Sequence, residues 1–463
     1  MRTPASLLFA VMVLASGCGS SDAGPAGDDS GGTSSAGASS GGGSTGGTGT
    51  VASCDGVTCS GHGECTLSDG SASCACAAGY RAVGVLCVAE DATDLCAGLV
   101  ADQSPHPMTA LAKPAVGLAV TDPEFGTTIR RLTDVGGSGV IKPMYSPTQA
   151  WNADESYLLL YEVGHGHLLY DGQTYEYVRD VAISPPDLEQ VYWSTTEPDV
   201  LFWIRENELM RYRVSTDASE AIQTIDCDGQ VTADSHAWIS WDSDRLGLYC
   251  EDSGTAFIYE LGSGTILGSA ESAESAPMIG ASGTLAYWDG GVYDETMNLV
   301  RGLDLASAGE HCSLGMLANG HDTYNLVQFD TGPGGSGVGS LVTFDMTDGT
   351  SRVVVGPDVG YPYPPSGTHL SAPIYQRPGW VFLSIVGELD GAGVLDQELV
   401  LADTNEGGAV CRIAHHRSQE AQDYWGEPHV TGSPSGTRAV FGSDWGGGES
   451  VDTYVVELPL FGG

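Results

Sequence analysis

Short apolar and aromatic runs recur along the chain after Cys96, and each is bounded by Gly, Asp, Asn, Ser or Pro. No stretch keeps the three- and four-residue spacing of an amphipathic helix. A polar turn that leads into an apolar strand appears repeatedly, at 151–161, 241–249, 281–288 and 433–441. A second apolar run closes a hairpin after most of these units, as at 256–261 and 453–458. This pattern predicts an all-β domain made of repeated hairpins.

Repeated four-stranded units of this length are typical of the blades of a β-propeller. The turns resemble the short repeats of periplasmic propellers of the TolB type, in which a Ser-Pro-Asp-Gly turn precedes a strand. About seven blades fit between Val116 and Leu458, with six or eight as alternatives. A β-sandwich or a β-helix explains the internal repetition less well. We therefore expect a β-propeller domain over 116–463.

The first residues have the order of an export signal. Arg2 supplies the positive start, Leu7 to Leu14 form a short apolar core, and residues 15–17 are small. The sequence Leu-Ala-Ser-Gly before Cys18 resembles a bacterial lipobox, in which the cysteine thiol receives a lipid. An ordinary secretory signal with an incidental cysteine is the alternative.

If the lipobox is used, the mature protein begins at Cys18. We then expect a signal peptide over 1–17 and a Gly/Ser-rich disordered tether over 18–53, because that composition buries too little apolar surface to fold. The protein would be an exported lipoprotein, anchored to the membrane through Cys18 on the periplasmic side or at the cell surface.

Six cysteines crowd into the segment 54–88, which is too small and glycine-rich for an adequate apolar core. Their spacing alone leaves the connectivity open. The single residue between Cys74 and Cys76, and the Gly-His-Gly stretch before Cys65, resemble an EGF-like domain. The acidic cluster of the calcium-binding members is missing, so calcium is not expected there. We expect a small EGF-like module that serves as a spacer or contact element, followed by a linker over 89–115.

The EGF-like resemblance implies the disulfides Cys54 to Cys65, Cys59 to Cys74 and Cys76 to Cys87. In the large domain, a disulfide between Cys227 and Cys250 is plausible if the two lie on neighbouring strands of an exported protein. The remaining cysteines have no partner that the sequence identifies: Cys96, Cys312 and Cys411.

The 463 residues include 60 acidic and 17 basic side chains, which gives a formal net charge of -43. Such a chain repels phosphate backbones, which excludes nucleic acid as a partner. Most of this charge is expected to be a solvated surface that favours solubility and attracts cations.

Histidines gather at turns and strand starts of the expected propeller, most densely near the C-terminus. His415, His416 and the stretch from Tyr424 to His429 resemble the last blades of oligogalacturonate lyases, seven-bladed enzymes that bind manganese through histidines and a glutamine at the channel mouth. The resemblance covers roughly the last third of the chain. It implies a divalent metal site made of His369, Glu427 and His429, with His311, Gln422 or His416 nearby.

The chain departs from the pattern of that family at two positions. The paired histidines around a proline become Glu427-Pro428-His429, and the upstream glutamine falls on Tyr424. Glutamate is itself an acceptable ligand, so manganese, calcium and zinc are all candidate ions.

Two functions are compatible with these features. The first is a non-catalytic propeller that binds a glycan or a protein. The second is a metal-dependent polysaccharide (oligouronide) lyase acting by β-elimination, with His311 as candidate base and Arg301 or Arg377 as candidate cation. The scarcity of lysine and arginine favours the binding function. Seven aromatic residues are candidates for stacking on sugar rings, with inter-blade packing as the alternative: Trp193, Phe202, Trp203, Trp238, Trp241, Trp288 and Trp380.

Overall fold

The structure is a computed structural model, and it describes Cys54 and residues 63–68, 71–83, 86–89, 94–233, 239–271, 275–305, 311–328, 339–362, 368–420 and 423–461. The signal peptide and the tether expected over 1–53 lie outside this part of the chain. Within it, no helix has the length and apolar character needed to span a membrane.

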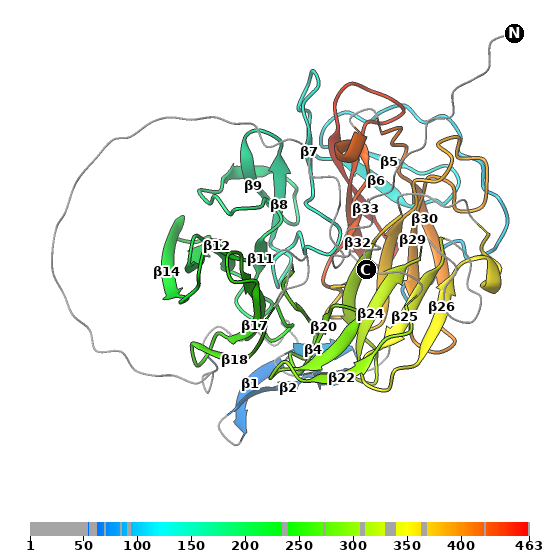
Figure 1. The fold of residues 1–463 in the computed structure, drawn as a ribbon. Helices are drawn as coiled ribbons and strands as arrows, with labels where there is room; N and C mark the ends of the chain where they lie inside the picture. The colour runs from blue at the N-terminus through cyan, green and yellow to red at the C-terminus, as the bar shows by residue number, and fades with distance from the viewer. Residues whose placement is uncertain are drawn as a thin grey trace, which may run out of the picture.

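Seven antiparallel sheets follow one another around the molecule in chain order, from β8 and β9 to β32 and β33 (Figure 1). Each sheet is one blade, and its first strand lies at the central axis. The expected all-β propeller of about seven blades is therefore confirmed. The innermost strands are β7 (Ile141–Lys142), β11 (Val191–Trp193), β15 (Val231–Thr232), β19 (Met278–Ile279), β23 (Cys312–Met316), β27 (His369–Ser371) and β31 (Thr431–Gly432).

Two further strands of each blade lie behind the innermost one. The second strands are β8 (Tyr157–Glu162), β12 (Val200–Arg205), β16 (Arg245–Cys250), β20 (Leu285–Trp288), β24 (Asp322–Val327), β28 (Trp380–Ser384) and β32 (Arg438–Ser443). The third strands are β9 (Gly166–Asp171), β13 (Glu208–Arg213), β17 (Thr255–Glu260), β21 (Gly291–Asp294), β25 (Leu341–Asp345), β29 (Glu398–Asp403) and β33 (Asp452–Glu457).

The fourth strands form the rim. In the first six blades they are β10 (Tyr177–Asp180), β14 (Ala218–Thr224), β18 (Thr265–Ala270), β22 (Leu299–Gly302), β26 (Ser351–Val355) and β30 (Val410–His415). Two short 3-10 helices, η3 (Pro357–Val359) and η4 (Asp423–Gly426), lie in the connections.

The last blade is built from both ends of the domain. Its inner three strands come from the C-terminus, and its outer strands are β6 (Thr128–Arg131) and β5 (Ala119–Thr121). Strand β33 pairs with β6 in register, with Val456 opposite Ile129. This pairing closes the ring, and it places the first blade beside the last, where β7 contacts β32 and β33.

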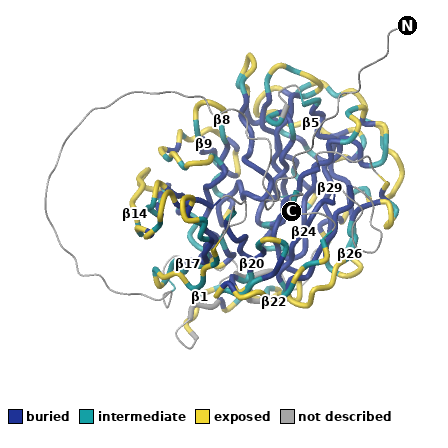
Figure 2. The backbone as a smooth tube through the Cα atoms, in the orientation of Figure 1, coloured by how far each residue is buried: buried dark blue, intermediate teal, exposed yellow. Residues whose placement is uncertain are grey.

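Burial follows the layers of the blades, with buried chain in the interior and exposed chain at rim strands such as β14 (Figure 2). The second strands are largely buried on both faces because each blade packs between two others. In β8, Leu158 and Leu160 pack against Val440 of the last blade, whereas Leu159 packs against Trp203 of the second. Continuous apolar runs therefore replace the alternation of a half-exposed sheet.

Strand β30 is an exception among the rim strands, because all of its residues are buried. The segment before the propeller covers it: Val100 forms a bridge with Arg412, and the Nη1 of Arg412 donates to the carbonyl oxygen of Ser104. A disulfide between Cys96 and Cys411 ties the same segment to β30. From Leu95 onward, the segment expected as a linker over 89–115 is thus packed against the propeller.

Two small sheets precede this segment: β1 (Gly63–Ser68) pairs with β2 (Ser71–Cys76), and β3 (Tyr80–Val83) pairs with β4 (Leu86–Ala89). Disulfides join Cys54 to Cys65 here and Cys227 to Cys250 in the propeller. Cys74 and Cys76 are also disulfide-bonded. The pairings implied with Cys59 and Cys87 stay predictions, since Cys59 and the side chain of Cys87 lie outside the described part of the chain.

Candidate metal centre

The inner strands of the blades all run in the same direction, because each blade starts at the axis and ends at the rim. Residues that precede or begin these strands therefore meet at one mouth of the propeller. His311 precedes β23, His369 begins β27, and His429 lies just before β31. Strand β27 contacts both β23 and β31, so the three histidines come from consecutive blades.

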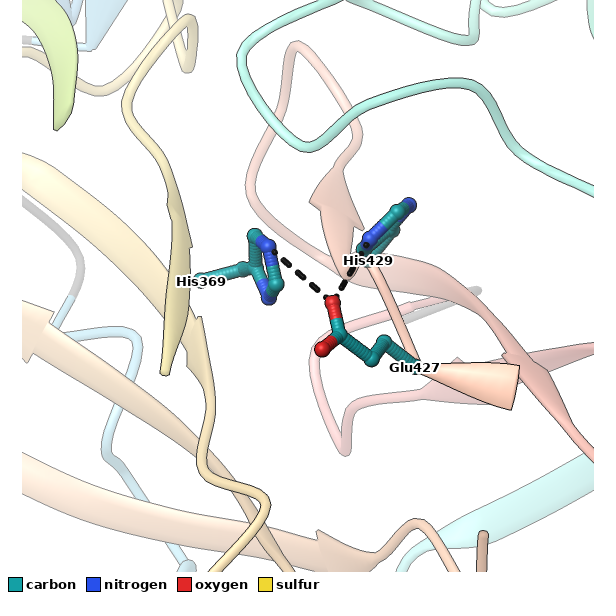
Figure 3. Close-up of side chains that lie close together, drawn as sticks. All are labelled: His369, Glu427 and His429. Atoms are coloured by element: carbon teal, nitrogen blue, oxygen red, sulfur yellow. Dashed lines mark hydrogen bonds and ion pairs between the residues drawn. The ribbon is translucent and has the colours of Figure 1, made fainter. Parts of the chain in front are cut away.

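His369, Glu427 and His429 converge at this mouth (Figure 3). The Oε2 of Glu427 lies 3.3 Å from the Nε2 of His429 and 3.5 Å from the Nε2 of His369. One ligand atom from each residue lies within 4.8 Å of the other two. Both histidine side chains are 1% exposed and that of Glu427 is 23% exposed. The structure thus brings together the three residues that were predicted from the sequence as metal ligands.

The three donors fit a divalent transition ion. Two ligand atoms that are each about 2.1 Å from an ion, at about 90–109° to one another, lie roughly 3.0–3.4 Å apart. The separation of 3.3 Å lies within that range, and the separation of 3.5 Å lies just above it. Calcium and magnesium prefer oxygen ligands throughout, whereas two imidazoles and a carboxylate suit transition ions such as zinc or manganese. The donor set therefore argues against calcium, one of the candidate ions.

His311 lies against this cluster without being one of the convergent donors. Its ring stacks on that of His369, with centroids 4.0 Å apart and planes inclined by 20°. Its Nδ1 lies 2.8 Å from the carbonyl oxygen of Thr368, to which only a protonated nitrogen can donate. Burial lowers the pKa of His311, so the ring is neutral at pH 7 and Nε2 is its acceptor nitrogen. A general base requires this tautomer.

Tyr145 packs edge-on against all three histidines. Its ring centroid lies 6.2 Å from that of His311, 5.2 Å from that of His369 and 5.3 Å from that of His429. The ring of Tyr424 lies 4.8 Å from that of His429. These contacts restrict rotation of the imidazoles, so the donors are held in place before any ion binds.

Two buried ionisable residues lie beside the cluster. Lys142 ends β7 and is 1% exposed, and its Nζ donates to the carbonyl oxygens of Trp425, at 3.3 Å, and of Glu427. Glu189 lies just before β11 and accepts from the hydroxyl of Tyr424 at 3.1 Å.

Burial perturbs the pKa values of both residues. It lowers the pKa of Lys142 to about 7, although the charges of Glu427 and Glu189 oppose the change. Burial, with a smaller contribution from the charge of Asp187, raises the pKa of Glu189 to about 8. Perturbed groups of this kind cluster at functional sites.

Lys142, Tyr145 and Glu189 were not predicted from the sequence. They belong to the first two blades, far along the chain from the histidines, and the closed ring brings them to the same mouth. The signal that could have found Lys142 and Glu189 is their place at or just before an inner strand. That position also distinguishes His311, His369 and His429.

Several other candidates lie away from the cluster. The Nε2 of buried His416 is bonded to the carbonyl oxygen of Ile385 at 3.0 Å, so it supports a connection behind the site. His415 ends the rim strand β30. Gln422 lies outside the described part of the chain.

The expectation that Arg301 or Arg377 supplies positive charge at the site is wrong. Arg301 is on the rim strand β22 and donates to the carbonyl oxygen of Thr347. Arg377 follows the far end of β27 and donates to the carbonyl oxygen of Gln376, at the opposite end of that strand from His369.

The aromatic residues considered for sugar stacking serve mainly as packing between blades. Trp288 is half-buried and packs edge-on against Tyr293, and Trp238 lies outside the described part of the chain. The remaining five are buried: Trp193, Phe202, Trp203, Trp241 and Trp380. Of these, Trp193 and Trp241 also line a cavity of about 40 Å³ between the inner strands.

In comparisons with known proteins, no protein-family model and no curated protein matches the sequence. Among solved structures, the oligogalacturonate lyase from Vibrio parahaemolyticus gives a TM-score of 0.54 at 14% identity, covering 74% of this chain and 96% of that one. An oligogalacturonate lyase in complex with manganese gives a TM-score of 0.49 at 15% identity, with the same coverage. At these identities the likeness concerns the fold: this chain carries a seven-bladed β-propeller similar to that of oligogalacturonate lyase.

Proposed function

We propose that the protein is a divalent-metal-dependent lyase that cleaves uronate-containing saccharides by β-elimination at the mouth of the propeller. The observation that carries this proposal is the convergence of His369, Glu427 and His429, with His311 stacked beside them. The similarity of fold to an oligogalacturonate lyase supports the choice of substrate class.

β-Elimination from a uronate removes the proton at C5, forms a double bond between C4 and C5, and expels the oxygen at C4 with its electron pair. A divalent ion held by the three donors would neutralise the uronate carboxylate, which acidifies the C5 proton. We assign to His311 the role of taking that proton at Nε2, since its Nδ1 is bonded to the carbonyl oxygen of Thr368.

The test is an ultraviolet assay for unsaturated uronides, with the full chain, oligogalacturonate and added manganese or zinc. We expect His369→Ala and His429→Ala to lose metal binding and activity together. His311→Ala should keep metal binding, measured by calorimetry, while kcat falls by about 100-fold or more. A metal-loaded wild type that forms no unsaturated product from galacturonate, glucuronate or mannuronate oligomers would contradict the proposal.

A propeller that binds a glycan or a protein without catalysis is the second candidate, and the charges around the site favour it. Lys142 directs its ammonium to two backbone carbonyls, and neither Arg301 nor Arg377 reaches the cluster. A polyanionic substrate would then depend on the ion for positive charge. Metal-dependent binding of a saccharide without any ultraviolet signal would establish this function instead.

We also propose that a lipid on Cys18 anchors the protein to a membrane, with 18–53 as tether and the EGF-like module as spacer. The order of signal, cysteine and linker supports this, as do disulfides such as Cys96 to Cys411, which favour an oxidising compartment. Cys18→Ala should release the protein from membrane fractions. Continued sedimentation with membranes after carbonate extraction would argue against the anchor.

A further inference from the structure

The loop that carries two of the three donors is held through its backbone. Each carbonyl oxygen from Tyr424 to Pro428 accepts a hydrogen bond. The donors, in chain order of the acceptors, are the N–H of Glu427 at 3.2 Å, the Nζ of Lys142 at 3.3 Å, the Oγ of Ser418, the Nζ of Lys142 again, and the N–H of Gly442 at 2.8 Å.

This loop has a conformation that its sequence does not favour by itself. His429 has a φ of 44°, in the left-handed region that residues with a Cβ rarely adopt. The surroundings must therefore hold the backbone that aims the Glu427 carboxylate and the His429 imidazole at a common point.

Lys142 is the side chain that bonds two of these five carbonyls, and it belongs to a different blade. It ends the inner strand of the first blade, whereas the loop precedes the inner strand of the last. Its stem is buried, and its Nζ lies 5.9 Å from the centre of the Tyr424 ring.

We propose that Lys142 is the positioning residue of the metal centre: by holding the carbonyls of Trp425 and Glu427, it fixes the loop in the conformation that presents Glu427 and His429 to an ion. This inference rests on the metal site of the proposed function. It adds a residue that lies outside the ligand set and acts through the backbone.

The chain offers a matched control, because it has two lysines. Lys113 donates to Asp452 at 2.6 Å, with 29% of its side chain exposed, and has no contact with the loop among the described interactions. Lys142→Met and Lys113→Met are thus the same chemical change. The first removes the contacts with the loop, and the second does not.

The experiment compares the full-length wild type with these two variants. Calorimetry measures the Kd for zinc and manganese, hydrogen exchange measures protection of amides 424–430, and the visible absorption of bound cobalt reports the ligand geometry. For Lys142→Met we expect a Kd raised by about 10–100-fold, faster exchange confined to the loop, and an altered cobalt spectrum. Lys113→Met should match the wild type in all three, even if its thermal stability falls.

The outcomes separate this inference from the proposed function. If Lys142→Met binds metal with wild-type affinity and spectrum, the positioning role is refuted while the metal site stands. If the wild type binds no metal but Lys142→Met loosens the loop, the positioning of the loop stands and the metal function falls. Should Lys142→Met not fold, Lys142→Ala removes both N–H donors without placing a longer apolar side chain among the carbonyls, and wild-type affinity and loop exchange in that variant would overturn the proposal.

Discussion

Removal of the Cys96–Cys411 disulfide should destabilise the protein more than removal of the Cys227–Cys250 disulfide. The first bond joins residues that are 315 apart in the sequence, and the second joins residues that are 23 apart. In the chain-entropy model, these bonds restrict the unfolded chain by about 5.7 and about 3.4 kcal/mol at 25 °C. The difference of about 2 kcal/mol is the quantity to test, because errors of the model that are common to both bonds cancel.

Lost packing in the folded state should further increase this difference in the free energy of unfolding. Cys411 is fully buried, and Cys96 packs with Leu95 in the cluster that also contains Trp380. Alanine at both positions leaves space in that cluster, whereas Cys227 is only partly buried beside Cys250. The lost packing therefore adds to the entropic loss at the first bond more than at the second.

Thermal unfolding of the two double alanine variants provides the measurement. For a propeller of this size, a difference of 2 kcal/mol corresponds to a Tm about 3 °C lower for Cys96→Ala/Cys411→Ala than for Cys227→Ala/Cys250→Ala. Urea unfolding should give the same order. An equal or smaller loss on removing the Cys96–Cys411 bond would refute the argument that this bond restrains the long loop.

Two further predictions concern buried charge. Burial lowers the pKa of His416 to about 4 from 6.5, so its contribution to stability is complete above pH 6.5 and is lost as pH falls from 6.5 to 4. The stability difference between wild type and His416→Gln in urea should shrink by up to about 3 kcal/mol over that range, and a constant difference would contradict this. Arg438→Met should lower the free energy of unfolding by about 3–5 kcal/mol, because it removes the partner of buried Glu155. Adding Glu155→Gln should recover most of the Tm, and no recovery would count against the charge argument.

The blades could be predicted because their pattern is local. The run Leu158 to Leu160 is buried on both faces by neighbouring blades, and a polar turn at either end marks where each strand stops. Closure of the ring could not be predicted in this way. The pairing of β6 with β33 joins segments from opposite ends of the domain, and nothing in either segment specifies the other.

The residues of the candidate site also differ in whether a local sequence pattern could predict them. His369, Glu427 and His429 were found through a resemblance carried by a contiguous motif and by one upstream histidine. Lys142 and Glu189 have no motif, and each alone is an ordinary charged residue in a very acidic chain. Both residues are buried, which is unusual for charged side chains. This burial depends on the first two blades lying near the last in the closed ring.

The candidate site lies at the closure seam, the boundary where the first blade lies beside the last. Metal binding there should therefore depend on whether the ring is closed. Glu427 and His429 belong to the blade that β6 completes, and Lys142 reaches their loop from the adjoining first blade. Val140 bridges Val451, and the Oγ1 of Thr453 donates to the carbonyl of Ile141, along the same seam. If Lys142 holds the loop as proposed, separation of the first and last blades would take it away from the loop that carries Glu427 and His429. An ion that binds only the closed arrangement must therefore stabilise closure, by about 2.7 kcal/mol when present at a hundred times its Kd.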